Sequence, residues 1–446
     1  MKIKRRYVSL IILAALAYLF FLKIAYSGVP FLYVASPHSL WYDLDAAELQ
    51  KITSGTVSLI VLKDWREKLR RAGLSAADLI IADDLRELKL FLRDKPDAVA
   101  LVPWYCADPS LRTLRLDGVY FWAEPHEYTL RLPQFRWNGM PQFDPRQIRN
   151  ITIGGTVVLS RGVGNVIDRA DDVHYPWQDV AMVFQEADLA IVNLKSPLVY
   201  DYVRPSSRLQ LYGQARYARG LASAGIGLVS LAGNHIGDAG TAGIADTMAI
   251  LDKMQIRYTG VGRELADAYE PQIIDLGGLR VAFLAVNAVG PNRYRDTDLR
   301  GQEIIYHVAS FQAEPLLEAL AKTAEADLRI ALCNWGEEYT AEPNKMQKDW
   351  AAWLTARGVQ IVAGDQAHWV QKADFREGAV ISYGLGNLIF DQTWADDTRE
   401  GVIERYFVYG QRLMTVDILP VFLNNQWYTE ISTERARIQK ILSRMF

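Results

Sequence analysis

Between residues 151 and 392, short apolar runs alternate with segments of helical periodicity, and this alternation limits the possible folds more than any other feature. The predicted strands are residues 151–153, 157–159, 189–192, 228–231, 280–285, 328–332, 360–363 and 379–383. Helical patterns separate many of them, for example at 243–254 and 345–356. Strands that alternate with helices form a largely buried sheet with helices outside, so we predict an α/β domain here.

A smaller α/β lobe is predicted over residues 30–132. Its apolar runs and helical patterns are at 30–35, 57–62, 98–102, 65–72 and 76–93. Residues 133–150 are rich in Pro, Gly, Gln and aromatic side chains and are predicted to be a linker. Residues 393–446 are expected to complete the larger domain, with strands at 412–419 and 427–431 and a helix from Thr433.

The N-terminus has the pattern of a membrane anchor. Residues 1–6 form a basic tail, predicted to be cytoplasmic, and residues 7–26 are largely apolar, with Lys23 able to reach the interface. About 20 such residues cross a bilayer, and flanking positive charge stays inside. We therefore expect a protein that crosses the cell membrane once, with its C-terminal bulk extracytoplasmic. The alternative is a cleaved signal sequence, with residues 25–27 as a weak cleavage site.

Charge and cysteine content narrow the functional classes. The net charge is −3 over 446 residues, and the body of the chain has no basic stripe, so nucleic acid is not an expected partner. The two cysteines, Cys106 and Cys333, lie far apart and lack CxxC spacing, which argues against a disulfide framework or a thiolate metal site.

Polar, turn-rich clusters follow several predicted strands of the larger domain. They are residues 154–156, 193–197, 233–238, 334–339, 364–368 and 384–387. Ligand sites of α/β sheets form outside the carboxyl ends of strands, so loops of this kind can converge on one pocket. Each loop taken alone is also explained as an ordinary turn, because Gly and Asn adopt positive φ and Asn or Asp caps helices.

The order and spacing of these motifs resemble the capsule-synthesis family of the CapA/PgsA type, over about residues 150–392. The resemblance rests on segments 187–197, 229–238, 258–262, 334–339 and 383–390, with Gly240 and Thr247. It implies a calcineurin-like metallophosphatase fold, an α/β-β/α sandwich of two facing sheets. It also implies a role in poly-γ-glutamate capsule production, with polymer-synthesis membrane proteins and an anionic surface polymer as partners.

This chain departs from the family pattern at most of the metal-site motifs. The family's Gly-Asp after the first strand is Gly154-Gly155 here, and Lys195 replaces an acidic residue. Asn334 replaces a histidine, and residues 364–368 read Gly-Asp-Gln-Ala-His instead of Gly-His-His-Pro-His. The residues that still match, and that would be catalytic in an active enzyme, are Asn234, His235 and His368.

Electrostatics argues against a two-metal centre in this chain. Two neighbouring divalent ions need several carboxylate and imidazole ligands to offset their mutual repulsion, and Lys195 adds positive charge instead. Of six histidines, His38, His126, His174 and His307 lie outside the motifs. We therefore predict no metal cofactor. The alternative is one divalent ion such as Mn or Zn at His235, Asp365 and His368.

The same loops supply candidate substrate-binding or rim residues. They are Asn193, Lys195, Asn334, Trp335, Glu337, Asp365 and Asn387. Because an unpaired buried lysine is costly, we expect Lys195 to pair with Asp365 or Glu337. Three tryptophans (Trp335, Trp369 and Trp394) line a ligand groove in one interpretation and pack in the core or rim in the other. Cys333 at a strand end is either a nucleophile or a buried thiol.

The smaller lobe resembles one lobe of a periplasmic solute-binding protein, a class that binds ligands between paired lobes. We predict an accessory protein of capsule or poly-γ-glutamate biosynthesis or export, whose pocket binds or scaffolds as a pseudoenzyme. The alternatives are a metal-dependent phosphoesterase or other hydrolase, with a reduced site that includes Asn234, His235, Asp365 and His368, and a solute-binding protein.

Overall fold

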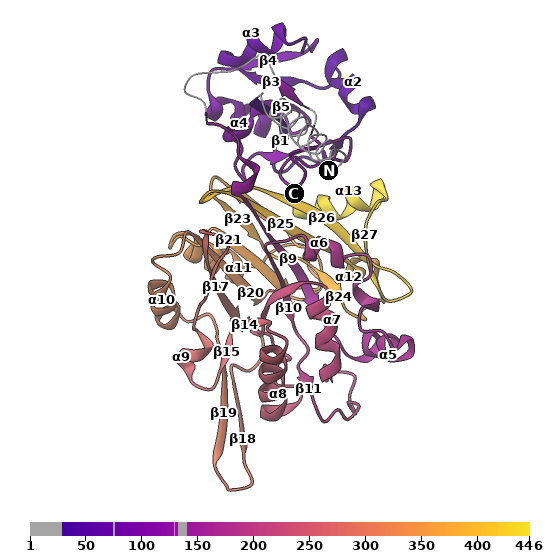
Figure 1. Cartoon of the computed structure of the whole chain (residues 1–446), viewed down its shortest axis with the longest axis vertical. Coiled ribbons are helices and arrows are strands. Elements are labelled where there is room, and N and C mark those ends of the chain that lie inside the picture. Colours follow the sequence, from indigo (N-terminus) through magenta and orange to yellow (C-terminus); the bar gives the residue numbers. More distant parts are fainter. Residues whose placement is uncertain (1–28, 75, 129, 133–140) are drawn as a thin grey trace, which may run out of the picture. The chain divides into compact units, whose positions relative to one another are not determined.

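The computed structural model describes residues 29–446 apart from 75, 129 and 133–140 (Figure 1). The chain divides into two compact units, Met1–Ile148 and Arg149–Phe446.

The predicted cytoplasmic tail and membrane segment, residues 1–6 and 7–26, lie outside the described residues. Within the part of the chain that is described, no helix is both long and apolar enough to span a bilayer. The first eight residues of the predicted linker, 133–140, are also outside the described residues, and its last three already belong to strand β9, which begins at Ile148.

The smaller unit is built on one mixed sheet with the strand order β4-β3-β5-β1-β6, and β8 also pairs with β1. Strand β3 runs parallel to β4 and β5, whereas β1 is antiparallel to β5. Its elements are β1 (Val29–Ala35), β2 (Asp43–Leu44), α2 (Ala46–Ser54), β3 (Leu59–Leu62), α3 (Lys63–Arg71), β4 (Leu79–Ala82), α4 (Leu85–Asp94), β5 (Val99–Pro103), η1 (Trp104–Cys106), β6 (Arg112–Thr113), β7 (Arg115–Leu116) and β8 (Arg131–Leu132).

The single helix predicted over residues 76–93 is wrong in its first part. Leu79–Ala82 forms strand β4, paired in parallel with β3. Helix α4 begins only after Asp84, whose carboxylate accepts a hydrogen bond from the Glu87 backbone N–H at 2.8 Å. The backbone groups of the apolar run before Asp84 hydrogen-bond to a neighbouring strand. Local periodicity does not reveal such a partner.

The larger unit contains two main sheets among its described residues. One has the order β14-β13-β10-β9-β25-β26-β27 with β24 beside β9, and the other has the order β16-β17-β20-β21-β23-β22. The first comprises β9 (Ile148–Val157), β10 (Leu189–Leu194), β13 (Ile226–Ser230), β14 (Arg257–Thr259), β24 (Asn387–Ile389), β25 (Glu400–Tyr409), β26 (Arg412–Leu423) and β27 (Thr429–Ile431). The second comprises β16 (Gln272–Asp275), β17 (Arg280–Asn287), β20 (Leu328–Trp335), β21 (Ile361–Gln366), β22 (Ala373–Arg376) and β23 (Ala379–Ser382).

Helices cover the outer faces of these sheets (Figure 1). Helices α6 and α7 contact β10 and β13 of the first sheet, and α10 and α11 share an apolar core with β17, β20, β21 and β23 of the second. The helices are α5 (Arg161–Ala170), η3 (Tyr175–Trp177), α6 (Ala181–Gln185), η4 (Ala215–Tyr217), α7 (Ala218–Ser223), α8 (Gly240–Lys253), α9 (Leu265–Ala268), α10 (Ala313–Lys322), α11 (Lys345–Thr355), α12 (Asp396–Arg399) and α13 (Arg435–Met445). The mixed α/β architecture predicted for this region is therefore present.

The larger unit also contains two small sheets. They are β11 (Leu198–Val199) with β12 (Gly213–Gln214), and β15 (Val261–Gly262), β18 (Arg293–Thr297) and β19 (Glu303–Val308) in a three-stranded sheet. The β18–β19 hairpin extends away from the body of the larger unit (Figure 1).

Strand β25 is a long central strand that the apolar pattern did not predict. Its apolar run is interrupted by Glu400, Glu404 and Arg405, yet all three are buried. Each has a partner across the fold: the Arg405 guanidinium, for example, donates to Asp417 of β26 at 2.5 and 2.9 Å. Charged residues that find such partners in the tertiary structure cannot be distinguished from loop residues by periodicity alone.

Glu404 links the two sheets. Its carboxyl group accepts hydrogen bonds from the Ser382 hydroxyl in β23, at 2.5 Å, and from Tyr406 in β25. Complete burial raises the pKa of Glu404 to about 7, although both hydrogen bonds act in the opposite direction. The buried position therefore favours the neutral acid.

This shift predicts a specific pH dependence of stability. Between the ordinary carboxyl pKa of 4.5 and about 7, the unfolded chain has lost the Glu404 proton while the folded protein keeps it, so stability falls as pH rises through this window and levels off above it. The expected loss is on the order of 3 kcal/mol. Melting temperature measured against pH should show that Glu404→Gln removes most of this decline, whereas Glu318→Gln, at an exposed carboxyl of α10, preserves it. A wild-type slope in Glu404→Gln contradicts the assignment.

Candidate functional site

The polar loops predicted as a pocket converge at the carboxyl ends of the parallel strands. In the first sheet, β9, β10, β13 and β14 are parallel neighbours, and Asn193 of β10 is in register with Ser230 of β13. In the second sheet, β17, β20 and β21 are parallel, and Asn334 is paired with Asn287 and Asp365. The strand ends therefore carry their following loops to one edge of the sandwich.

The two sheets meet closely at this edge. Within the first sheet, the Thr156 backbone N–H of β9 donates to the Gly386 carbonyl, just before β24, at 3.1 Å. Across to the second sheet, the Thr156 hydroxyl donates to Asp365 of β21. A cavity of about 20 Å³ remains between the sheets, lined in part by Gly155, Asn193 and Asp365. That volume accommodates about one water molecule.

Lys195 lies at the centre of this edge. It directly follows β10, its side chain is completely buried, and its Nζ donates a hydrogen bond to Gln366 Oε1. Gln366 Nε2 in turn donates to Glu338 Oε1 at 3.1 Å. Burial lowers the pKa of Lys195, and the charges of Asp365 and Glu338 oppose that shift.

The partner expected for Lys195 was Asp365 or Glu337, and the structure gives a different one. Gln366 makes the hydrogen bond, Asp365 acts on the ammonium through its charge, and Glu337 is solvent-exposed. The second carboxylate whose charge acts on the Lys195 ammonium is Glu338, not Glu337. Whether Glu337 or its neighbour Glu338 acts on Lys195 depends on how this loop folds, which sequence spacing does not determine.

Two histidines flank this buried centre. His235 follows β13 and its Nδ1 lies 2.7 Å from Asp238 Oδ2, which leaves Nε2 facing away from that carboxylate. His368 is almost fully buried, with Nδ1 2.9 Å from Asn387 Oδ1 and Nε2 4.0 Å from Glu338 Oε1. Burial first, and then the charge of Lys195, hold the pKa of His368 well below its ordinary value.

The remaining predicted residues divide between the site and the core. The Asn334 amide donates to Asn287 Oδ1 at 2.7 Å. Trp335 lies in the apolar core, parallel to Phe311 at 5.4 Å, and its indole N–H donates to the Tyr383 carbonyl at 2.9 Å, so it does not line the rim. Trp394 is 62% exposed and contacts Tyr339, whose ring stacks on His368. Trp369 is partly buried.

Cys333 is not placed to act as a nucleophile. Its side chain is buried at the end of β20, and burial alone raises the pKa of the thiol far above its ordinary value. The thiolate, which is the reactive form, is therefore disfavoured.

Backbone strain is concentrated at this edge. Four residues other than glycine have left-handed backbone conformations here: Arg161 (φ 47°), Tyr339 (63°), Gln366 (89°) and His368 (58°). Arg161 also forms an ion pair with Asp391 and lies 5.1 Å from the Phe390 ring centroid. Conformations of this kind cost about 1–3 kcal/mol each and persist where the surrounding structure enforces them, often at functional sites.

The comparisons with known proteins identify the family. The profile of the family described as bacterial capsule synthesis protein PGA_cap matches residues 150–392, more than half of the chain. This chain belongs to that family. The motif-based resemblance is thereby confirmed.

Individual relatives share low identity with the chain. The capsule biosynthesis protein CapA of Bacillus anthracis is 24% identical over 281 residues, which cover 61% of this chain and 66% of that protein. The PGA biosynthesis protein CapA of Bacillus subtilis is 24% identical over 60% of this chain and 70% of its own length. A probable polyglutamine synthesis accessory protein of Mycobacterium tuberculosis is 25% identical over 57% and 69% of the two chains.

Solved structures resemble the chain more weakly. A hypothetical protein from Thermus thermophilus has a TM-score of 0.39 at 14% identity, covering 61% of this chain and 98% of that one. An ABC-type phosphate transport receptor from Vibrio cholerae has a TM-score of 0.19 at 12% identity, covering 21% and 48%. At these scores neither likeness defines a fold or a function for this chain.

Three observations at this edge bear on metal binding. Among the described residues, no group of three or more His, Cys, Asp or Glu side chains is arranged to hold a metal ion. At residue 155, where the resemblance implies a carboxylate, a Cβ atom would lie 2.1 Å from the Gly386 carbonyl oxygen. The backbone therefore leaves no room for an aspartate at that position, and the buried ammonium of Lys195 adds positive charge nearby.

A pair of glycine substitutions tests this close approach. Gly155→Ala should destabilise the larger unit by about 1–3 kcal/mol or more, because the Gly386 backbone must move to admit a methyl group. Gly233→Ala is the matched control at the same edge, since its Cβ would meet Lys195 Cγ at an ordinary 3.8 Å. Thermal unfolding should separate the two variants clearly. Equal melting temperatures would show that the β9 backbone does not approach the Gly386 carbonyl as described.

Several residues of the site were not assigned a role from the sequence. Asp238 has a usable signal, because it lies three residues after His235 in one loop. Gln366 and Glu338, by contrast, meet across segments 28 residues apart and carry no spacing signal. Thr156 and Asp365 are 209 residues apart, and only the packing of the two sheets joins them.

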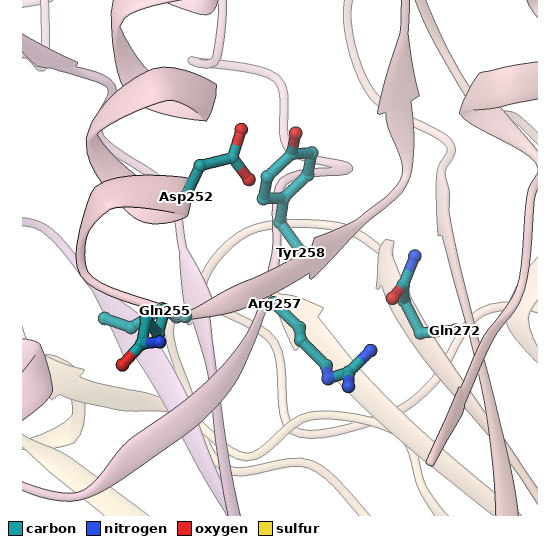
Figure 2. A pocket seen from close by; sticks show the side chains of 6 residues that line it. Asp252, Gln255, Arg257, Tyr258 and Gln272 are labelled. Atoms are coloured by element: carbon teal, nitrogen blue, oxygen red, sulfur yellow. The ribbon is translucent and has the colours of Figure 1, made fainter.

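A separate surface pocket of about 410 Å³ lies at the edge strands β14 and β16. Figure 2 shows Asp252 at the end of α8 beside Tyr258, with the side chains of Arg257 and Gln272 extending from the two edge strands. The charge of Asp252 and its hydrogen bond add to burial in raising the pKa of Tyr258. None of the strand-end residues described above lines this pocket.

Proposed function

We propose that this protein is a membrane-anchored, extracytoplasmic accessory component in the synthesis or export of an anionic surface polymer of the poly-γ-glutamate type. Membership of the capsule synthesis family supports the process, as do relatives named for capsule and PGA biosynthesis. The apolar segment 7–26, preceded by basic residues, supports the anchor. The partners proposed on this basis are the cytoplasmic membrane, polymer-synthesis membrane proteins and the polymer, without nucleic acid.

We further infer that the larger unit is a metallophosphatase-like sandwich whose strand-end site binds or scaffolds and does not hydrolyse. This proposal rests on residues 155 and 195. Residue 155 has no space for a side chain beside the Gly386 carbonyl. Lys195 places a buried ammonium among the loops where metal ligands would be needed. Several acidic and imidazole ligands are required to offset the repulsion of two divalent ions, and the part of the chain that the structure describes forms no cluster of three such ligands.

The second candidate function is a metal-dependent phosphoesterase with a reduced site. It is favoured by the paired Asp238–His235 side chains, which leave His235 Nε2 available at a partly exposed position, and by the strained backbone around His368. Asn234 and Asp365 complete that hypothetical set.

Metal analysis combined with an activity assay separates the two. The full-length protein, purified in detergent, should contain substoichiometric Mn, Fe and Zn and should hydrolyse a generic phosphodiester no faster than its His235→Ala variant. The scaffold proposal fails if metal is present at one equivalent per chain and His235→Ala abolishes measurable turnover. Asp349→Ala, at an exposed residue of α11, controls for loss of activity from handling.

Solute binding through residues 30–132 remains a third hypothesis, carried by the sequence resemblance of that lobe. A ligand of the lobe would raise its melting temperature in proportion to the logarithm of ligand concentration above Kd. The same stabilisation should persist after deletion of the larger unit, which distinguishes it from binding at the strand-end site.

A further inference from the structure

The buried ammonium group of Lys195 lies where loops from both sheets converge. Lys195 comes from the end of β10, and its hydrogen-bond acceptor Gln366 is the last residue of β21 in the opposite sheet. The two residues are 171 positions apart in sequence. One hydrogen bond from a charged donor therefore joins the two sheets at the edge where their strand-end loops meet.

Buried oxygen acceptors that make no hydrogen bond to Lys195 Nζ lie on the loops next to it. Asn193 Oδ1, Asn234 Oδ1 and Asp365 Oδ2 are buried and have no hydrogen-bond partner among the described residues. The loops that carry them are adjacent: a Cβ placed on Gly233 would lie 3.8 Å from Lys195 Cγ and 4.0 Å from Asn193 Oδ1. Buried acceptors of this kind are costly unless a cation or a donor satisfies them.

The nearby charges do not offset those of two divalent ions. The Lys195 ammonium supplies a single positive charge, and Asp365 and Glu338 are the carboxylates whose charges act on it. Two divalent ions would bring four positive charges to the same loops. Asp365 and Glu338 together would offset only two of those four charges, and Lys195 adds one more.

The loop held by this ammonium is strained. Gln366 and His368, on either side of Ala367, both have positive φ. Strain of this kind persists only when neighbouring contacts fix the conformation. The hydrogen bonds of Gln366, one from Lys195 and one to Glu338, fix its side chain at both ends.

We propose that the Lys195 ammonium is a tethered cation that replaces a metal ion structurally, holding the loops after β10, β13 and β21 around it and fixing residues 365–368 in their strained conformation. This proposal rests on the proposed absence of a two-metal centre, and it assigns a positioning role to Lys195, not a catalytic one. It predicts that the charge and donor capacity of the side chain matter beyond its volume.

Chemical rescue tests the proposal in the full-length protein. Lys195→Ala removes the side chain beyond Cβ, and n-propylammonium has the atoms that are lost. The variant should lose roughly 5–10 °C in melting temperature, and n-propylammonium should restore at least half of this loss with saturation. Wild type and the neutral, similarly long Lys195→Met should not respond, and propanol should not rescue Lys195→Ala. The proposal is contradicted if propanol rescues Lys195→Ala as well as the ammonium does. It is also contradicted if Lys195→Met is as stable as wild type.

A local readout separates this role from general packing. Hydrogen exchange at the backbone amides of residues 365–368 should become at least tenfold faster in Lys195→Met than in wild type. Lys372→Met is the control, because that lysine is about half exposed in a surface ion pair with Glu342 of the same unit. Unchanged exchange in Lys195→Met contradicts the proposal.

Two further outcomes are distinguishable. If Lys195→Ala does not accumulate in folded form, it is refolded with and without n-propylammonium; recovery that requires the ammonium supports the proposal, and equal or absent recovery contradicts it. Metal at one equivalent per chain in wild type would contradict the proposed scaffold function itself. A metal-free wild type without ammonium rescue would remove only the role assigned to Lys195.

Discussion

Strand β9 pairs closely with the segment that enters β24 in the same sheet, and at Gly155 the approach of the Gly386 carbonyl leaves no space for a side chain. The Thr156 N–H donates to that carbonyl, and the Thr156 hydroxyl donates to Asp365 of the opposite sheet. The positions of the other strand-end loops follow from this contact, because each loop continues from a strand whose register is fixed by the same sheets. A close backbone approach of this kind is available only to glycine.

The chemistry of the site follows from how this packing is combined with charge. A carboxylate cannot fit at residue 155, and a lysine from β10 enters the interior instead, where Gln366 accepts its hydrogen bond. His368 is kept neutral by burial and by the positive charge of Lys195. At this edge the buried Lys195 side chain and its hydrogen bond to Gln366 therefore join loops from both sheets.

Much of the fold was predictable because its strands are short apolar runs, and buried parallel strands are apolar along their whole length. Two exceptions show what local patterns miss. Leu79–Ala82 was assigned to a helix and Glu400–Tyr409 was missed, because the first has no distinctive period and the second carries Glu400, Glu404 and Arg405. Leu79–Ala82 is a strand because it pairs with β3. In Glu400–Tyr409, partners such as Ser382 and Asp417 offset the cost of burying the charged residues.

The sequence by itself determined the α/β class, the family and the set of loops that form the site, since these depend on periodicity and on motifs within single segments. It also indicated that Lys195 stands where an acidic residue is usual. Only the tertiary structure decided that Gln366 and Glu338, not Glu337, form the network around Lys195, that Trp335 packs in the core, and that residue 155 has no room for an aspartate. These outcomes depend on close packing between residues far apart in the chain, which local sequence patterns do not encode.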